Sequence, residues 1–132
     1  MRGGERMVEV RPVPVRTLLE MGLLGEAHLV CGRKGLDRKI HHLTVVGGPI
    51  VEPWLKENEL VMTTGYALKD DPESIEALLE LLIKHDAAGF VFKEGLYLPP
   101  NLTPRAVEIA EEAGLPVIRV ARETLWADVM ES

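Results

Sequence analysis

Residues 59–92, ELVMTTGYALKDDPESIEALLELLIKHDAAGFVF, contain a complete strand–helix–strand unit. Glu59–Thr63 is an apolar run short enough to be a buried strand, and Ala88–Phe92 is a second one. Asp71-Pro72-Glu73 suits the start of a helix between them, because aspartate caps, proline fits the first turn and glutamate complements the helix dipole. The apolar side chains that follow recur at helical spacing and predict its buried face: Ile75, Leu78, Leu79, Leu82 and Ile83.

The same pattern repeats directly downstream. Thr103-Pro104 predicts the start of a second helix, Gly114 with Pro116 its end, and Val117–Val120 a further strand. Successive strands joined by helices favour a parallel sheet with crossover helices. The sequence therefore predicts an α/β fold with a mostly parallel sheet.

The upstream part of the chain predicts an antiparallel element. Residues 27–31 and 39–46 are rich in apolar and β-branched types and indicate two strands, separated by a glycine-containing turn over residues 32–38. We expect them to form an N-terminal β-hairpin. A short helix is expected from Val15 until Gly22, and short helices also at residues 50–56 and 123–130. Residues 1–14 are predicted to be a flexible arm, and residues 15–132 a single domain.

Charge and hydropathy exclude several classes of protein. The 132 residues carry 15 Lys and Arg against 21 Asp and Glu, a net charge of −6. Residues 51–132 hold 7 basic and 16 acidic side chains, so the acidic excess lies there. Because duplex-DNA-binding proteins usually present a basic face, we expect no direct nucleic acid contact by this segment. No apolar run approaches the roughly 20 residues of a membrane span, so we expect a cytoplasmic protein without membrane contact.

The residue types that most often carry catalysis are scattered along this chain. His41 and His42 are neighbours in a predicted strand, where consecutive side chains point to opposite faces, so we expect no metal site. Cys31 is the single cysteine, and with His28 predicted on the other face of its strand we expect a small buried side chain. The glycine pairs lack nucleotide-binding fingerprints, so no cofactor is expected. We therefore predict that the chain is not an enzyme.

Polar residues follow the predicted parallel strands at their carboxyl ends. Ligands of open α/β sheets bind at that edge, and a planar or anionic small molecule would suit the residues found there. The alternative is that the two threonines satisfy a tight turn and the tyrosine covers the end of the sheet. The predicted ligand-binding residues are Thr63, Thr64, Gly65, Tyr66, Lys93 and Glu94.

Several short motifs follow one another in a distinctive order. Glu59-Leu60-Val61-Met62-Thr63-Thr64-Gly65 is the most specific, and Gly35-Leu36-Asp37-Arg38 and Pro53-Trp54-Leu55 precede it. Ala88-Gly89-Phe90 and Gly114-Leu115-Pro116-Val117-Ile118 follow it. In order and spacing these motifs resemble the N-terminal domain of PucR-type transcriptional regulators, and more distantly the DRTGG domain and the N-terminal domain of HPr kinase. Gly35, Leu36, Asp37, Arg38 and Glu59 are the family-motif residues of the predicted site.

The resemblance implies a regulatory domain that senses a small metabolite. In that family the domain normally precedes a DNA-binding helix-turn-helix, often in control of purine catabolism, and no such module is recognised in these residues. We therefore expect the sensing domain of a transcription regulator, with a small-molecule effector and a homodimeric assembly. The alternative is a ligand-free dimerisation or protein-interaction module, standing alone or within a larger regulator.

Overall fold

The computed structural model describes residues 5–22, 24–46, 55–64, 74–94, 102–121 and 123. The described elements are six strands, three α-helices and one short 3₁₀ turn, η1, which lies between the second and third strands. The elements in chain order are β1 (Glu5–Pro14), α1 (Val15–Glu20), β2 (Ala27–Cys31), η1 (Arg33–Gly35), β3 (Lys39–Val46), β4 (Glu59–Thr63), α2 (Ser74–Lys84), β5 (Gly89–Lys93), α3 (Pro104–Ala113) and β6 (Val117–Val120).

Within these residues, six strands form a single mixed sheet in the order β1-β3-β4-β5-β6-β2. The four central strands, β3, β4, β5 and β6, run parallel to one another, and β1 and β2 close the two edges in antiparallel orientation. Helices α2 and α3 each connect two neighbouring parallel strands. The predicted α/β fold with a mostly parallel sheet is confirmed.

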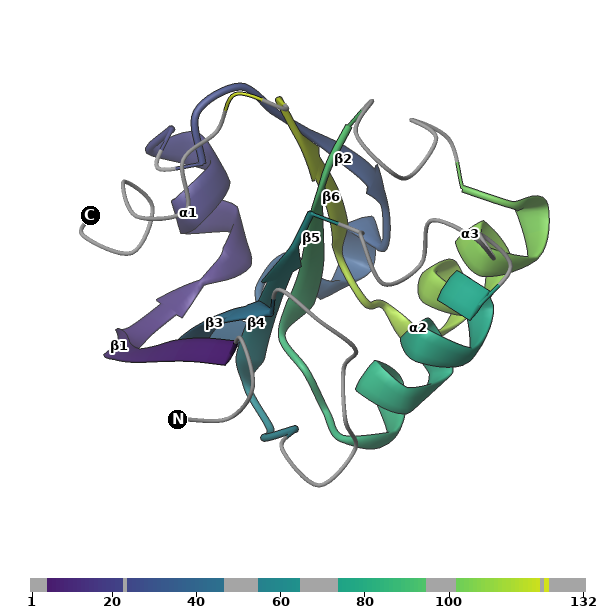
Figure 1. Ribbon diagram of the computed structural model, residues 1–132, viewed down its shortest axis with the longest axis horizontal. Helices are drawn as coiled ribbons and strands as arrows, with labels where there is room; N and C mark the ends of the chain where they lie inside the picture. The colour runs from purple at the N-terminus through teal and green to yellow at the C-terminus, as the bar shows by residue number, and fades with distance from the viewer. Residues whose placement is uncertain are drawn as a thin grey trace.

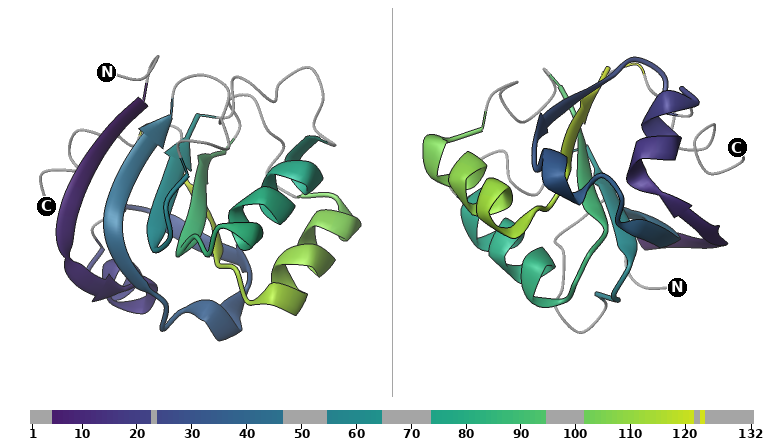
Figure 2. Two further views of the ribbon diagram at one scale, coloured as in Figure 1. Left: turned by 90° about the horizontal axis from the view of Figure 1, so that it is seen from below. Right: turned by 180° about the vertical axis from the view of Figure 1, so that it is seen from behind.

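The sheet separates two layers of helix. Helices α2 and α3 lie side by side on one face, and α1 lies on the other (Figures 1 and 2). Alternate strand residues accordingly enter two core clusters: Val61 and Phe90 pack with α2 and α3, whereas Leu60 and Val91 pack with α1. Burial on both faces explains why the central strands read as continuous apolar runs rather than as alternating ones.

Helix α2 presents its predicted apolar face to the sheet. Ile75, Leu79 and Leu82 are at most 2% exposed, and each such side chain stabilises the fold by about 2 kcal/mol relative to an exposed position. The predicted helix start at Asp71-Pro72-Glu73 lies outside the described residues, and α2 is described from Ser74 onward.

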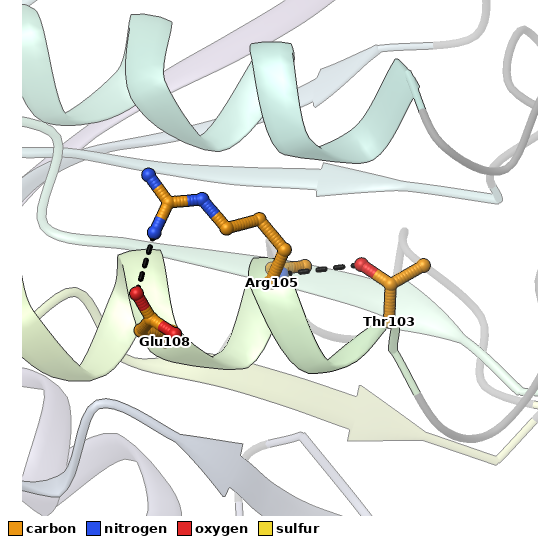
Figure 3. A network of polar contacts seen from close by, with 4 residues as sticks. Thr103, Arg105 and Glu108 are labelled. Atoms are coloured by element: carbon orange, nitrogen blue, oxygen red, sulfur yellow. Dashed lines mark hydrogen bonds and ion pairs between the residues drawn. The ribbon is translucent and has the colours of Figure 1, made fainter.

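Helix α3 begins at the predicted cap. The hydroxyl oxygen of Thr103 accepts a hydrogen bond from the backbone N–H of Ala106 at 3.1 Å (Figure 3). The same hydroxyl donates to Oε2 of Glu76 in the first turn of α2, at 2.7 Å, so one side chain links the two helices. On the exposed side of α3, Arg105 pairs with Glu108 one turn later (Figure 3). Gly114 ends the helix in the left-handed conformation, as predicted.

The predicted N-terminal hairpin is wrong in its pairing. Both strands exist with the expected bounds, but β2 pairs with β6 and β3 pairs with β1 and β4. In the sheet, β2 and β3 lie four strand positions apart, which is about 19 Å at the usual spacing between strands. The seven residues that connect them can span about 25 Å. The segment that resembles a hairpin turn is therefore a crossing loop, residues 32–38, beneath the amino-terminal ends of the central strands. An antiparallel N-terminal element does exist, formed by β1 and β3.

The flexible arm expected over residues 1–14 is wrong for the part that the structure describes, which begins at Glu5. Glu5–Pro14 forms β1, which pairs with β3 from Glu5↔Val46 to Pro14↔Lys39. Val8, Val10 and Val13 pack against the core cluster on the α1 side, which stabilises the strand. The two prolines are tolerated because β1 is an edge strand with a register irregularity between Glu9 and Val13. That residues 15–132 form a single domain stays a prediction.

The other predicted elements lie partly outside the described residues. Helix α1 begins at Val15 as expected and ends at Glu20, before Gly22. Of the helix expected over residues 50–56, only Leu55 and Lys56 are described, and they are not helical. Of the terminal helix expected over residues 123–130, only Glu123 is described.

Arg38 fastens the crossing loop to the segments that lead into two central strands. Its Nε and Nη2 donate to the carbonyl oxygens of Gly114 and Ala113 at 2.8 and 3.0 Å. Its Nη1 donates to the carbonyl oxygen of Ala87, just before β5, at 3.4 Å. Carbonyl groups at the end of α3 lack helical partners and carry partial negative charge, so a guanidinium group is well suited to them.

Gly35 lets the backbone of the crossing loop pack directly against the backbone at the end of α3. A Cβ atom at Gly35 would overlap the carbonyl oxygen of Gly114, so only glycine fits there. Two further bonds tie the loop to the helix: the N–H of Gly32 donates to Oε1 of Glu111 at 2.9 Å, and Nζ of Lys34 to the carbonyl oxygen of Glu112 at 2.9 Å.

We predict that Arg38→Met lowers the free energy of unfolding by about 3 kcal/mol, because it removes charge-assisted bonds to partly buried carbonyls. Chemical denaturation of the variant and the parent protein measures the difference. Arg16→Met is the matched control, since Arg16 is 45% exposed and pairs with the exposed Asp37. That surface pair should be worth less than about 1 kcal/mol. Equal losses from both substitutions would contradict the assigned role of Arg38.

We also predict that Gly35→Ala destabilises the protein by about 3 kcal/mol, because the loop or the end of α3 must shift to admit one methyl group. Gly25→Ala is the control: Gly25 has a φ of +70° but no atom within 4 Å of an added Cβ. Its cost should be confined to backbone strain, about 1 to 2 kcal/mol. Thermal unfolding of both variants decides the comparison, and a Gly35→Ala protein as stable as the parent would refute the close packing.

Candidate functional site

The carboxyl ends of the central strands bring together part of the predicted ligand site. Thr63 ends β4 and is opposite Phe92 of β5, so Thr63 and Lys93 lie on neighbouring strands at the same edge. Thr63 is 4% exposed, and Thr64, Lys93 and Glu94 are half-buried. The remaining two predicted residues, Gly65 and Tyr66, lie outside the described residues.

The sheet divides these side chains between its two faces. Thr63 shares the face of Phe92, which packs towards α2 and α3. Lys93 is one residue further along β5 and shares the face of Val91, which packs towards α1. The predicted site residues therefore lie on both faces of the sheet at its carboxyl edge and do not line one wall of a single pocket.

Arg119 of β6 joins this edge, although it was not among the predicted site residues. Its Nε lies 2.9 Å from Oε2 of Glu94, and both side chains are partly exposed. Arg119 is opposite Phe92 in the next strand, which places it on the face of Thr63. The signal in the sequence was its position in the third parallel strand, next to the carboxyl end.

Lys93 brings positive charge to the other side of this edge. Partial burial lowers the pKa of Lys93 below its usual value, because desolvation disfavours the ammonium form. A nearby anion would favour the ammonium form of Lys93 and would be attracted to it.

The family-motif residues lie at the opposite, amino-terminal edge of the sheet. Gly35 and Arg38 hold the crossing loop against α3 through the contacts described above. Leu36 is 4% exposed and belongs to the core cluster on the α1 side. Asp37 is exposed and accepts a bond from Nε of Arg16 at 3.1 Å. These four residues stabilise the fold and do not form a site with Thr63 and Lys93.

Glu59, the fifth motif residue, is a carboxylate in the interior. It is 1% exposed at the start of β4, and its Oε2 accepts a hydrogen bond of 2.9 Å from the hydroxyl of Thr44, which is also 1% exposed. Sequence reasoning missed Thr44, because a threonine among valines in a predicted strand looks like an ordinary β-branched residue. A buried carboxylate is costly unless it is hydrogen-bonded, so this bond is a condition for placing Glu59 there.

His42 lies beside Glu59 in the neighbouring strand. Its Nδ1 atom is buried and has no hydrogen-bond partner in the described part of the chain. The backbone N–H groups of His41 and His42 both donate to the carbonyl oxygen of Asn58, at 2.8 and 3.4 Å, so the strand is irregular at this point. That the side chains of His41 and His42 point to opposite faces stays a prediction. An unpartnered buried polar atom costs about 1 to 3 kcal/mol, and such atoms call for an explanation.

Cys31 is a buried side chain, as predicted. It is 3% exposed and packs in the core cluster beneath α2 and α3. Burial, with a smaller contribution from the charge of Glu111, raises the pKa of the thiol to about 11. The thiol is therefore protonated at neutral pH and is a poor nucleophile.

Among the described residues, no group of three or more His, Cys, Asp or Glu side chains is arranged to hold a metal ion. In the same residues, no helix combines the length and apolar character that crossing a bilayer requires.

The sequence pattern of the purine catabolism regulatory protein-like (PucR) family matches residues 17–132. This chain belongs to the PucR family. A curated relative, the purine catabolism regulatory protein of Bacillus subtilis (strain 168), is 28% identical over 106 residues. The alignment covers 80% of this chain and 20% of the relative, so the PucR-family chain spans about a fifth of the length of the protein that it matches. The resemblance to PucR-type regulators is confirmed.

The pKa of Cys31 predicts an alkaline loss of stability. The thiol is protonated in the folded protein up to about pH 11, whereas an unfolded thiol ionises from about pH 8.5. Its contribution is complete below the unfolded pKa and is lost as pH rises through the folded pKa. We expect the stability difference between the parent and Cys31→Ala to shrink by about 2 to 3 kcal/mol between pH 8 and pH 11. Urea denaturation at a series of pH values measures it, and a constant difference would contradict the burial of the thiol.

Proposed function

We propose that this chain is a small-metabolite-sensing domain of a PucR-type transcription regulator, acting without direct contact between this segment and DNA. Membership of the PucR family and similarity to a protein named for the regulation of purine catabolism support a regulatory role. The net charge of −6 supports a role other than holding DNA. In this proposal, DNA binding belongs to another part of a longer regulator.

The observation that carries the proposal is the set of polar side chains at the carboxyl edge of the parallel strands. Thr63 supplies a hydroxyl on one side of β4 and β5, and Lys93 supplies an ammonium group on the other. The pair of Glu94 and Arg119 lies at the same edge, one strand further on. Ligands of open α/β sheets bind outside this edge, where a molecule seated over the strand ends reaches side chains from both faces.

The chemistry of the edge favours a planar, anionic metabolite. The ammonium group of Lys93 attracts a negative charge, and its depressed pKa indicates an environment where an ion pair is only partly screened by water. Threonine hydroxyls both donate and accept hydrogen bonds, so they fit the alternating donors and acceptors of a heterocycle. A breakdown product of the purine ring has both properties.

Ligand binding would be read out through the assembly of the domain. We propose a homodimer with two arrangements and a ligand that binds one of them more tightly, because a ligand shifts an equilibrium only by its differential affinity. The difference of a few kcal/mol that such coupling requires lies within the range of ordinary effectors.

We expect the planar purines urate and xanthine at millimolar concentration to raise the melting temperature of the chain. A ligand at about ten times its Kd stabilises the native state by about 1.4 kcal/mol, a shift of several degrees for a domain of this size. Thr63→Val and Lys93→Met should reduce this rise in melting temperature. Lys39→Met is the control and should leave the rise unchanged, because Lys39 is an exposed residue at the start of β3. A thermal-shift series measures all three.

Two outcomes of the thermal-shift series would contradict the proposal. If none of these compounds, nor a wider panel of purines and ureides, stabilises the chain, ligand sensing is refuted and a ligand-free interaction module replaces it. If stabilisation occurs but is unchanged in Thr63→Val and Lys93→Met, the ligand binds elsewhere and the carboxyl edge is not the site.

A further inference from the structure

Strand β1 has a neighbouring strand on one side only. In the described part of the chain it is the first strand of the sheet and pairs with β3 alone, so it forms the margin of the sheet (Figures 1 and 2). The pairing is regular from Glu5 to Glu9, and Pro12 and Pro14 lie beyond that stretch. Every second residue of an edge strand directs its N–H and C=O groups away from the neighbouring strand. The regular stretch of β1 is therefore able to form hydrogen bonds with a further strand.

The same edge leaves apolar side chains partly in contact with solvent. Met7, Val8 and Val10 are half-buried, although Val8 and Val10 also pack against the core cluster on the α1 side. A strand added beside β1 would remove part of this apolar surface from water, which favours association. Glu9 and Arg11 are exposed on the same strand, so the added strand must also fit their charges.

Two-fold symmetry restricts how a second copy of β1 can pair with the first. Hydrogen-bonded and non-hydrogen-bonded residue pairs alternate along an antiparallel ladder, so a two-fold axis has to pass through a pair in which one residue faces its own copy. Residues that direct their backbone groups outward then meet residues that do the same. An axis inside the regular stretch that leaves two residues of β1 on either side passes through Met7, Val8 or Glu9.

The charges along β1 select one of these three axes. An axis through Met7 places Glu5 opposite Glu9 twice, and an axis through Glu9 places that residue opposite its own copy. An axis through Val8 places Glu5 opposite Arg11 twice and Met7 opposite Glu9 twice. Opposite charges directly across a ladder stabilise the pair of strands, whereas like charges destabilise it. The strand is therefore complementary to a second copy of itself in the register centred on Val8.

We propose that two copies of this chain associate through their β1 edges, antiparallel and about a two-fold axis at Val8, so that the two sheets join into one. The inference rests on the homodimer of the proposed function and names the surface that forms it. Strand β3 lies between this surface and β4, which ends at Thr63. The interface and the carboxyl edge therefore belong to one continuous sheet.

A cysteine at the axis tests the register directly. In this pairing the two copies of residue 8 face each other with Cα atoms about 4.5 to 5.5 Å apart, a separation that a disulfide can bridge. We expect Val8→Cys to give a covalent dimer under oxidising conditions, seen on a non-reducing gel. Val10→Cys is the matched control, because the two copies of residue 10 are offset by four residues, about 13 Å along the strand. The native Cys31 is 3% exposed and should not cross-link the parent chain.

Exchanging the charges tests the selection of the axis. Arg11→Glu places two carboxylates opposite each other at both ends of the paired stretch and should weaken the dimer by about tenfold. Combining Glu5→Arg with Arg11→Glu restores unlike pairs and should restore the dimer. Arg33→Glu makes the same change of charge at an exposed residue of η1 and should have no effect. Sedimentation equilibrium of the full chain over a wide range of concentrations measures each dissociation constant.

Several results would overturn the interface. They are a parent chain that stays monomeric at every concentration, equal cross-linking of Val8→Cys and Val10→Cys, and a dimer that Arg11→Glu leaves unchanged. A dimer of the parent chain without a disulfide in Val8→Cys would overturn the β1 surface while leaving the homodimer of the proposed function in place. Stabilisation by urate is measured separately, so failure of ligand sensing is distinguishable from failure of this interface.

Discussion

The guanidinium group of Arg38 reaches the carbonyl oxygens of Ala87, Ala113 and Gly114, at the ends of the segments that enter β5 and β6. Those bonds hold the crossing loop, which carries the chain from the edge strand β2 to β3, next to the opposite edge. The loop therefore lets two strands that are consecutive in the sequence lie four positions apart in the strand order. The packing of Gly35 against Gly114 requires the same geometry, so the loop and the end of α3 constrain each other.

This constraint divides the molecule into two edges with different roles. At the amino-terminal edge, Arg38 satisfies backbone carbonyl groups, and Gly35 and Leu36 pack closely against neighbouring segments. At the carboxyl edge, Thr63, Lys93 and the pair of Glu94 and Arg119 are held at the ends of rigid strands. Polar side chains at the ends of paired strands are suited to binding a ligand, because few side chains and loops have to become ordered when the ligand binds.

The sequence carried enough information to predict the strand–helix–strand units, because caps and apolar periodicity act locally. Thr103 and Gly114 specify the ends of α3 through contacts within a few residues. Strand pairing could not be predicted in the same way. Residues 32–38 resemble a hairpin turn, and only the distant carbonyl groups at the end of α3 make them a crossing loop. The role of Thr44 was hidden for a similar reason, since its partner Glu59 is 15 residues away in sequence.

Amide chemical-shift mapping with urate tests the division between the two edges most directly. The backbone resonances of the labelled chain are followed as urate, a planar anion, is added. We expect the largest changes at Thr63, Lys93 and Glu94, while the resonances of Gly32 to Arg38 stay in place. Changes concentrated in that crossing loop, or no change in any resonance, would contradict the account.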